Sequence, residues 1–510
     1  MGRSSSRQRT GRRGAAKSKS PKSAASPGVV RRIEPYEILD EAGLIAVEGT
    51  AERILSEVGV EIRDDEPSLQ LFREAGAQVT GTRVRFEPGM CRSIIQASAP
   101  STFTQHARNP ERSVEIGGDN IVFVPAYGAP FVRASDIERR YARLEDFETI
   151  VKLAYLSPHM HHSGGTVCEP TDVPVSKRHL AMVHAHLRLS DKPYMGGVTS
   201  GERAEDSIRM TEIVFGEKFV SENCCVLGLI NVNSPLVLDG TMLAALRVYA
   251  AAGQGTVITP FVIGGAGGPV TSAGMLAQSL AEILAGIALT QLVRPGAPVI
   301  FGYLSTGLNM KSGAPVRYDE TWKCFLAAGQ LARRLGVPFR CGSATSAAKL
   351  PDYQAGLESA LNFEAALLSG AHFMIHASGN VEGGLCVDLD KLLLDCEMLG
   401  MAARFAGGID TSQAALAFDA IKEAGPGGNF LVTAHTLKRY RDAFFASDLF
   451  DTTPYEHWRD AGELTSTEQA RTRRLALLNA YKPPPMDQSI AEALDDFVRT
   501  RKSELPDSFS

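Results

Sequence analysis

Eight short apolar runs recur along the chain at intervals of 32 to 41 residues, and this spacing constrains the fold more than any other feature. The runs begin near residues 121, 160, 193, 225, 257, 298, 338 and 372. Each run ends in small or polar residues and is followed by a segment of helical length with apolar residues at helical spacing. Strand, helix and strand in this order indicate parallel βαβ units. Eight consecutive units predict an α/β fold, a (β/α)8 TIM barrel.

An open, doubly wound sheet is the alternative arrangement of such units. It usually carries a glycine-rich dinucleotide fingerprint after its first strand, and the segment FVPAYGAPFV does not supply one. We therefore expect the barrel, with N-terminal and C-terminal helical extensions. The expected organisation is a disordered basic tail at 1–32, an N-terminal α/β flank at 33–115, the barrel at 116–405 and a C-terminal helical extension at 406–510.

Charge and cysteine usage narrow the class of protein. The first 32 residues hold ten Lys or Arg and no acidic residue, in a Ser/Gly-rich context that cannot bury enough apolar surface to fold. The remaining residues carry 43 basic and 58 acidic side chains, which argues against nucleic acid as a partner. The eight cysteines form no C-x-x-C pair, as is typical of reduced thiols. No apolar run approaches the ~20 residues that span a bilayer, so we expect a cytoplasmic protein without membrane insertion.

The loops at the carboxyl ends of the strands build the site of a (β/α)8 barrel, so the sequence indicates which residues to consider. The first six runs place there Tyr127, Glu169, Asn231, Asn233, Phe261, Gly264, Gly265, Tyr303 and Ser305. The last two runs place there Thr345, Lys349, Asp352, Gln354, His376, Asn380 and Glu382.

The motif HMHH at 159–162 raises the possibility of a metal site. Two histidines at i and i+2 on a strand face the same way, as in the H-x-H of metal-dependent amidohydrolase barrels. Such a site needs further ligands, and the fourth to sixth strand ends offer Asn231, Gly264 and Tyr303 instead of histidines. We therefore expect structural histidines and no metal ligands. The glycine-rich GGAGGP at 264–269 lacks the Lys-Ser/Thr ending of a P-loop.

Eight segments in fixed order carry a resemblance to a known family. They are TAERILSEVGVEI, LFREAGAQVTGTRVRF, RRYARLEDF, SDKPYMGG, INVNSPL, SATSAAKLPDYQAG, EGGLCVDLDKLLLDCEM and GGNFLVTAHTLKRYRDAFF. Together they resemble the trimethylamine methyltransferase family over nearly all of residues 31–500. Founding members of that family carry pyrrolysine in the barrel. This chain contains none, so it is similar to the non-pyrrolysine branch, whose known members use quaternary amines such as glycine betaine.

The resemblance implies a barrel that moves a methyl group from a methylated amine to the cobalt of a corrinoid. A separate, cognate corrinoid protein supplies that cobalamin-type group, so no cofactor is expected to bind this chain tightly. A trimethylammonium group favours an aromatic, weakly acidic pocket, where each ring face contributes about 0.5–2 kcal/mol. Expected substrate contacts are Tyr127, Glu169, Asn231, Asn233, Phe261, Tyr303, Lys349, His376 and Glu382. Loops expected to face the corrinoid contain Gly264, Gly265, Ser305, Thr345, Asp352, Gln354 and Asn380.

No catalytic side chain is assigned by the sequence, because displacement of a neutral amine from a quaternary nitrogen requires no general acid. A homo-oligomer is expected. Two other functions stay open at this point. One is a metal-dependent hydrolase of the amidohydrolase barrel type that uses HMHH, and the other is a betaine-binding barrel without catalytic activity.

Overall fold

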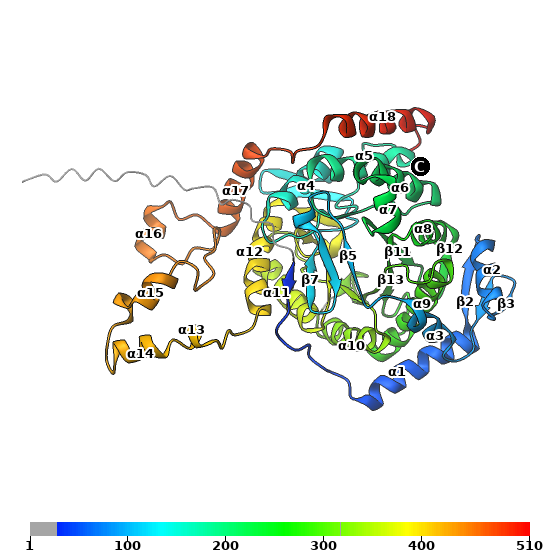
Figure 1. The fold of residues 1–510 in the computed structure, drawn as a ribbon, viewed down its shortest axis with the longest axis horizontal. Helices are drawn as coiled ribbons and strands as arrows, with labels where there is room; N and C mark the ends of the chain where they lie inside the picture. Colours follow the sequence, from blue (N-terminus) through cyan, green and yellow to red (C-terminus); the bar gives the residue numbers. More distant parts are fainter. Residues whose placement is uncertain (1–27, 317, 510) are drawn as a thin grey trace, which may run out of the picture.

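The computed structural model describes residues 28–316 and 318–509. Most of the tail predicted to be disordered, residues 1–32, therefore lies outside the described residues. The described residues 28–32 do not agree with that prediction, because they include a strand. Val29–Val30 form strand β1, which pairs antiparallel with β7 (Asn120–Phe123). The described residues form a mixed α/β fold in which helices surround a curved sheet (Figure 1).

Within the described residues, seven parallel strands form the centre of this sheet. In spatial order they are β10 (Tyr194–Met195), β11 (Val226–Val232), β13 (Gly255–Ile263), β14 (Val299–Leu308), β16 (Phe339–Gly342), β17 (Phe373–Ile375) and β7. Antiparallel strands β6 (Val114–Gly117) and β5 (Thr102–Gln105) continue beyond β7. Each of the seven parallel strands lies in one of the predicted runs, which confirms those seven assignments.

The second predicted run, HMHHSGG at 159–165, is not a strand in the structure. The segment nevertheless bonds to the strands at both edges of the parallel set. The His161 N–H donates to the Phe123 carbonyl at 3.2 Å, and the Ser163 N–H donates to the Pro193 carbonyl at 2.8 Å. The left-handed backbone of Gly164, with φ of +98°, interrupts regular strand geometry here.

Helices cover the outer, convex face of the sheet (Figure 1). They are α4 (Leu144–Leu156), α5 (Val175–Leu189), α6 (Gly201–Phe215), α7 (Glu217–Glu222), α8 (Gly240–Ala251), α9 (Ser272–Val293), α10 (Asp319–Leu335), α11 (Tyr353–Leu368) and α12 (Leu389–Ala406). By length and composition α9 could cross a membrane, which corrects the expectation that no apolar run is long enough. It is mostly buried inside the protein, where α1 (Glu41–Arg53) and α3 (Met90–Ser98) pack against it.

The N-terminal part adds a small sheet at one side of the body. Strands β2 (Val60–Arg63), β3 (Gln78–Thr80) and β4 (Arg83–Arg85) lie beside α2 (Glu66–Glu74). Strand β2 pairs with β12 (Val237–Asp239), which follows β11 directly in the chain. A further sheet joins β8 (Phe131–Ala134), β9 (Ile137–Tyr141), β18 (Asn380–Val381) and β19 (Cys386–Asp388). These pairings connect both flanks to the loops that follow the parallel strands.

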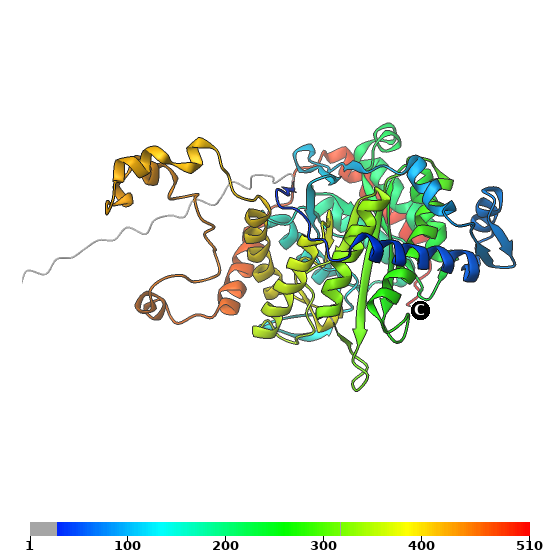
Figure 2. The ribbon, with the colours of Figure 1, turned by 90° about the horizontal axis from the view of Figure 1, so that it is seen from below.

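Strand β14 runs on past its neighbours and turns back through β15 (Pro315–Val316). The resulting hairpin projects from the body at the bottom of Figure 2. It marks the side of the molecule on which the parallel strands end.

The C-terminal part leaves the body after α12 and returns to it at α17 (Ser466–Ala480), which packs on α12 (Figure 1). Between them lie four short α-helices, α13 (Gln413–Leu416), α14 (Phe418–Ala424), α15 (Ala434–Arg439) and α16 (Tyr455–Asp460), and one 3-10 helix, η4 (Phe430–Val432). This excursion projects far from the sheet. The last helix, α18 (Gln488–Glu504), lies across α5 and α6.

Candidate functional site

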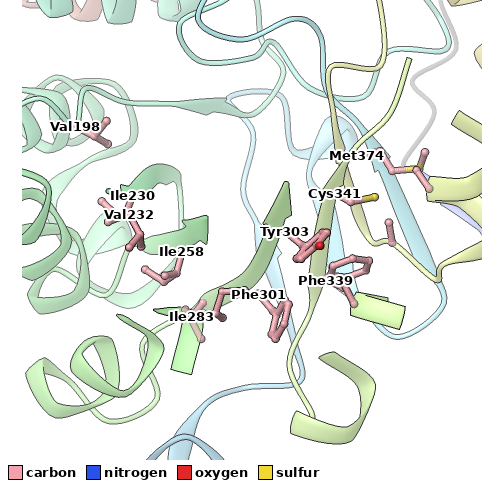
Figure 3. Packing of buried hydrophobic residues seen from close by; sticks show 14 of the residues in the cluster. Val198, Ile230, Val232, Ile258, Ile283, Phe301, Tyr303, Phe339, Cys341 and Met374 are labelled. Atoms are coloured by element: carbon pink, nitrogen blue, oxygen red, sulfur yellow. The ribbon is translucent and has the colours of Figure 1, made fainter. Parts of the chain in front are cut away.

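Alternate residues of a strand face opposite sides of a sheet, and here the two sides hold different clusters. One set, which includes Phe301, Phe339 and Cys341, packs in the main core beneath the helices (Figure 3). The other set includes Leu229, Val257 and Ile300 and forms a separate cluster on the inner, concave side. The inner side is therefore a distinct environment, lined by the alternate residues of each parallel strand.

Arg340 belongs to the inner side, because its neighbours Phe339 and Cys341 both belong to the outer core. Its side chain is 1% exposed, and Nη1 donates to the Tyr303 carbonyl oxygen at 3.4 Å. A buried guanidinium keeps its charge, so the inner side of the sheet carries a positive centre. Arg340 was not among the residues predicted for the site, although an arginine within the apolar run VPFRCG can be recognised in the sequence.

Two further polar residues lie in the same layer of the sheet. Arg340 pairs with Gly302 on β14, and a Cβ placed on Gly302 would lie 2.0 Å from Thr259 Oγ1 on β13. Thr259 pairs in turn with Asn231 on β11. The Thr259 hydroxyl is buried and has no hydrogen-bond partner among the described residues. Asn231, Thr259 and Arg340 form what we call the inner polar layer, in which the Thr259 hydroxyl packs against Gly302.

Aromatic rings lie near the carboxyl ends of two parallel strands, β7 and β13. Tyr127 joins the inner cluster, and a Cβ placed on Gly165 would lie 2.8 Å from its Cε2. Burial raises the pKa of Tyr127 to about 12, so its hydroxyl stays neutral. Phe261 lies two residues beyond Thr259 on the same side of β13 and is 37% exposed. Asn231 is also exposed, so solvent reaches this end of the inner side.

The structure places Tyr303 and Ser305 away from this group. Both occupy outer positions of β14, and the Tyr303 ring packs edge to face against Phe325 of α10 at 6.4 Å. The side chains at 303 and 305 are fully buried beneath the helices. Sequence position at a strand end could not decide this, because one residue along a strand changes the face.

The charged residues predicted at the mouth are engaged in contacts within the protein. Glu169 pairs with Arg178 at 3.1 Å, and Glu382 pairs with Arg139 at 2.8 Å. The Lys349 ammonium donates to the Ala347 carbonyl at 2.7 Å and is exposed.

The predicted loop residues mostly stabilise the loops themselves. Asn233 donates to Asp239, Asp352 accepts from the Ala355 N–H as the N-cap of α11, and Gln354 donates to Glu358. His376 and Asn380 lie together, with Nδ1 and Oδ1 at 3.2 Å. Thr345 is buried beside Glu358 and Asn362 in a small pocket, which is also lined by Tyr318 and Gly383.

Gly264 and Gly265 shape the turn that follows β13. The Gly265 N–H donates to the Gly268 carbonyl at 2.9 Å, and Gly265 has φ of +89°, which favours glycine. Gly265 is exposed, as is Val270 at 77% in the same loop. The loop therefore presents a surface with few polar side chains.

The three histidines of HMHH point to different surroundings. His161 Nδ1 accepts from the Phe123 N–H at 3.0 Å, and burial lowers its pKa to about 3. His162 contacts the Gln105 side chain at 3.2 Å, while the His159 ring packs against Phe445. Among the described residues, no group of three or more His, Cys, Asp or Glu is arranged to hold a metal ion. The motif thus stabilises the segment that links β7 with β10.

A parallel α/β sheet with aromatic and polar residues gathered at its carboxyl ends is typical of enzymes that bind small molecules. The chain belongs to the trimethylamine methyltransferase (MTTB) family, whose model matches residues 3–506. This confirms the resemblance noted in the sequence.

The chain is similar to three relatives over most of its length. Glycine betaine methyltransferase of Desulfitobacterium hafniense is 40% identical, over 92% of this chain and 98% of the relative. The proline betaine:corrinoid methyltransferase of Eubacterium limosum is 30% identical, over 78% of this chain and 84% of the relative. Trimethylamine methyltransferase MttB of D. hafniense is 28% identical, over 93% and 96% of the two chains.

Proposed function

We propose that the protein removes a methyl group from a carboxylate-bearing quaternary amine, a betaine, and transfers it to the cobalt of a corrinoid on a separate protein. The observation that carries the proposal is the buried Arg340 on the inner side of the sheet, on which the half-buried Tyr127 and the exposed Phe261 also lie. The 40% identity with a glycine betaine methyltransferase supports the same substrate class. The name of the proline betaine relative supports a corrinoid acceptor.

We also propose that the parallel strands close into a (β/α)8 barrel. The segment at 161–164 would take the place of the second strand between β7 and β10. The backbone bonds of His161 to Phe123, of Ser163 to Pro193 and of Met195 to Gly164 support this closure.

Recognition of a betaine requires two environments at a short distance from each other. In our proposal the Arg340 guanidinium binds the carboxylate, and the free hydroxyl of Thr259 donates a further hydrogen bond. The rings of Tyr127 and Phe261 hold the trimethylammonium group by cation–π attraction. Glu169 and Glu382 are ion-paired, so the rings contribute most of the attraction for the cation.

The proposed transfer is a direct displacement at the methyl carbon. The C–N bond breaks with its electron pair going to nitrogen, which leaves as a neutral tertiary amine. The new bond forms between that carbon and the reduced, nucleophilic cobalt of the acceptor. No proton moves in this step, which agrees with a neutral Tyr127 whose pKa is about 12. The chain's own contribution is to orient the methyl group outward and to exclude water.

The acceptor would approach the carboxyl ends of the strands. The loop at 264–270, with exposed Gly265 and Val270, offers a smooth surface against which a planar macrocycle can lie. We propose that the corrinoid comes with its partner protein and that this chain binds no cofactor tightly. A cytoplasmic location is part of the proposal and is supported by eight free, buried thiols.

The test is an absorbance assay with reduced cobalamin as the acceptor. Glycine betaine should convert reduced cobalamin to its methylated form in proportion to enzyme, with dimethylglycine as the second product. Trimethylamine should give no conversion. Binding of betaine by calorimetry without methyl transfer would replace the proposal by a binding protein, and stoichiometric zinc with hydrolase activity would favour the amidohydrolase alternative.

A further inference from the structure

The segment at 407–465, which we call the outer arm, exposes an unusual amount of apolar surface. Thirteen of the 31 exposed large hydrophobic side chains among the described residues lie in these 59 residues. They are Ile409, Leu416, Phe418, Ile421, Phe430, Leu431, Val432, Leu437, Tyr440, Phe444, Phe450, Tyr455 and Leu464. Several are nearly fully exposed, among them Ile409 at 91% and Phe444 at 84%.

The arm is held at its base and stands away from the body elsewhere (Figures 1 and 2). Arg404 Nη2 donates to the carbonyls of Asp442 and Ala443 at 2.8 and 2.9 Å. The Ser447 hydroxyl donates to Glu397 at 2.6 Å, and the Phe445 ring lies over Gly400. These contacts fix the direction of the arm, so its apolar side chains are presented outward from a defined place on α12.

The size of this surface indicates a partner. These side chains amount to on the order of 1,500 Å² of exposed apolar surface, because a large apolar residue carries about 150–250 Å². A stable interface buries about 800 Å² from each partner, so the arm has enough apolar surface to hold one.

The adjoining face of the body is apolar as well. Met401 and Phe405, one turn apart on the outer side of α12, are 40% and 56% exposed. They continue directly into Ile409 at the start of the arm. Each chain thus carries both an apolar arm and an exposed apolar face of α12, so two copies can cover each other's apolar side chains through the same contact made twice.

We propose that two copies of this chain pair by exchanging arms, the arm of each subunit covering the α12 face of the other. The part near 410–435, gold in Figure 2, lies level with the end of the body opposite to the β14–β15 hairpin. A protein that docks at the carboxyl ends of the strands would not cover it. A second copy of the chain covers the apolar side chains of both arms in one symmetric contact. This inference does not depend on the proposed reaction.

The experiment measures the mass of the full chain in solution at micromolar concentration, by light scattering or sedimentation equilibrium. The wild type should have twice the 54.7 kDa of one chain. Phe418→Asp/Leu431→Asp should sediment as a monomer with an unchanged circular dichroism spectrum. The matched control is Ile45→Asp, which changes an exposed apolar residue on α1 and should leave the mass unchanged. A monomeric wild type, or a double variant with the wild-type mass, would overturn the proposal.

A second measurement distinguishes this pairing from docking of the corrinoid protein on the arm. All eight native cysteines are buried, so a cysteine introduced by Leu431→Cys can be labelled selectively. Its reaction with a maleimide should be slow at high protein concentration and at least tenfold faster after dilution below the dimer dissociation constant. Fast labelling at every concentration would contradict the pairing. If the corrinoid protein alone protected the thiol, the arm would be assigned to that partner instead.

Discussion

At the scale of single residues, the position of Arg340 has the largest functional consequence. Its guanidinium is only 1% exposed, and fully buried arginines are rare in folded proteins. The residue can be recognised in the sequence as a charge within an apolar run. Its direction, opposite to that of Tyr303, became evident only from the pairing of β14 with β16.

Replacement of Arg340 by Met should lower the activity with a substrate that carries a carboxylate much more than the activity with one that lacks it. Loss of a charge-assisted contact of about 2–4 kcal/mol predicts a 30- to 1,000-fold lower kcat/KM for glycine betaine. The kcat/KM for choline, which lacks the carboxylate, should change less than threefold. The control Thr259→Val removes one neutral hydroxyl and should lower kcat/KM for glycine betaine about fivefold to tenfold. Equal losses with both substrates would indicate a structural role for Arg340.

The Tyr127 ring, and not its hydroxyl, should matter for binding. Tyr127→Phe keeps the ring and should retain KM within about threefold, whereas Tyr127→Leu should raise KM about fivefold to thirtyfold through loss of a cation–π contact of 1–2 kcal/mol. Since the pKa of Tyr127 is about 12, its titration should leave kcat constant between pH 6 and 10. A strong loss in Tyr127→Phe would assign a role to the hydroxyl.

Buried histidines should make the fold sensitive to mild acid. Burial lowers the pKa of His161 to about 3 and the pKa values of His186 and His372 to about 4, from 6.5. Below pH 6.5 the unfolded chain takes up protons that the folded chain does not. The free energy of unfolding therefore falls with decreasing pH, by about 1.4 kcal/mol per pH unit for each histidine.

One of these histidines offers a clean test. His372 accepts from the Phe339 N–H at 2.9 Å and contacts the Gly118 carbonyl at 3.0 Å, so glutamine can keep one bond of each kind. His372→Gln should make the free energy of unfolding, measured with urea, fall less steeply between pH 6 and pH 5. The reduction in slope should equal about the contribution of one histidine. The exposed control His457→Gln should leave the slope unchanged.

At the scale of elements, the first turns of α12 hold the loops after β16 and β17. Asp395 accepts from the Gly379 N–H at 2.7 Å and pairs with Lys391 at 2.6 Å. The Lys391 ammonium also donates to the Ala344 carbonyl at 3.4 Å. Burial raises the pKa of Asp395 from its ordinary value. One helix thus fixes two loops at the proposed site through a single buried ion pair.

Removal of one partner of this pair should cost far more than removal of both charges. Lys391→Met leaves an unpaired buried carboxylate, which predicts a loss of about 3–5 kcal/mol in the free energy of unfolding. Lys391→Met/Asp395→Asn keeps an acceptor for the Gly379 N–H and should recover most of that loss. Chemical denaturation of the three proteins measures this. A double variant as unstable as the single one would mean that the pair acts through packing.

At the scale of the whole molecule, the repeat of apolar runs was sufficient to locate the seven parallel strands. The segment at 159–165 resembles the other runs in sequence but does not pair as a regular strand. The Phe123 N–H donates to the His161 side chain, and Gly164 has a left-handed backbone. The outer arm could be recognised as helical, but not as a projection, because its apolar residues are compatible with a position against the body. Of the candidate site, strand ends were predictable, whereas side-chain directions depended on register.

The hairpin of β14 and β15 makes the rim of the sheet uneven (Figure 2). Its tip carries Met310, which is 78% exposed. The hairpin projects above one side of the surface formed by the strand ends, whereas the other side lies lower. In the proposed reaction, a bulky methyl acceptor would therefore approach the strand ends from the side away from the hairpin.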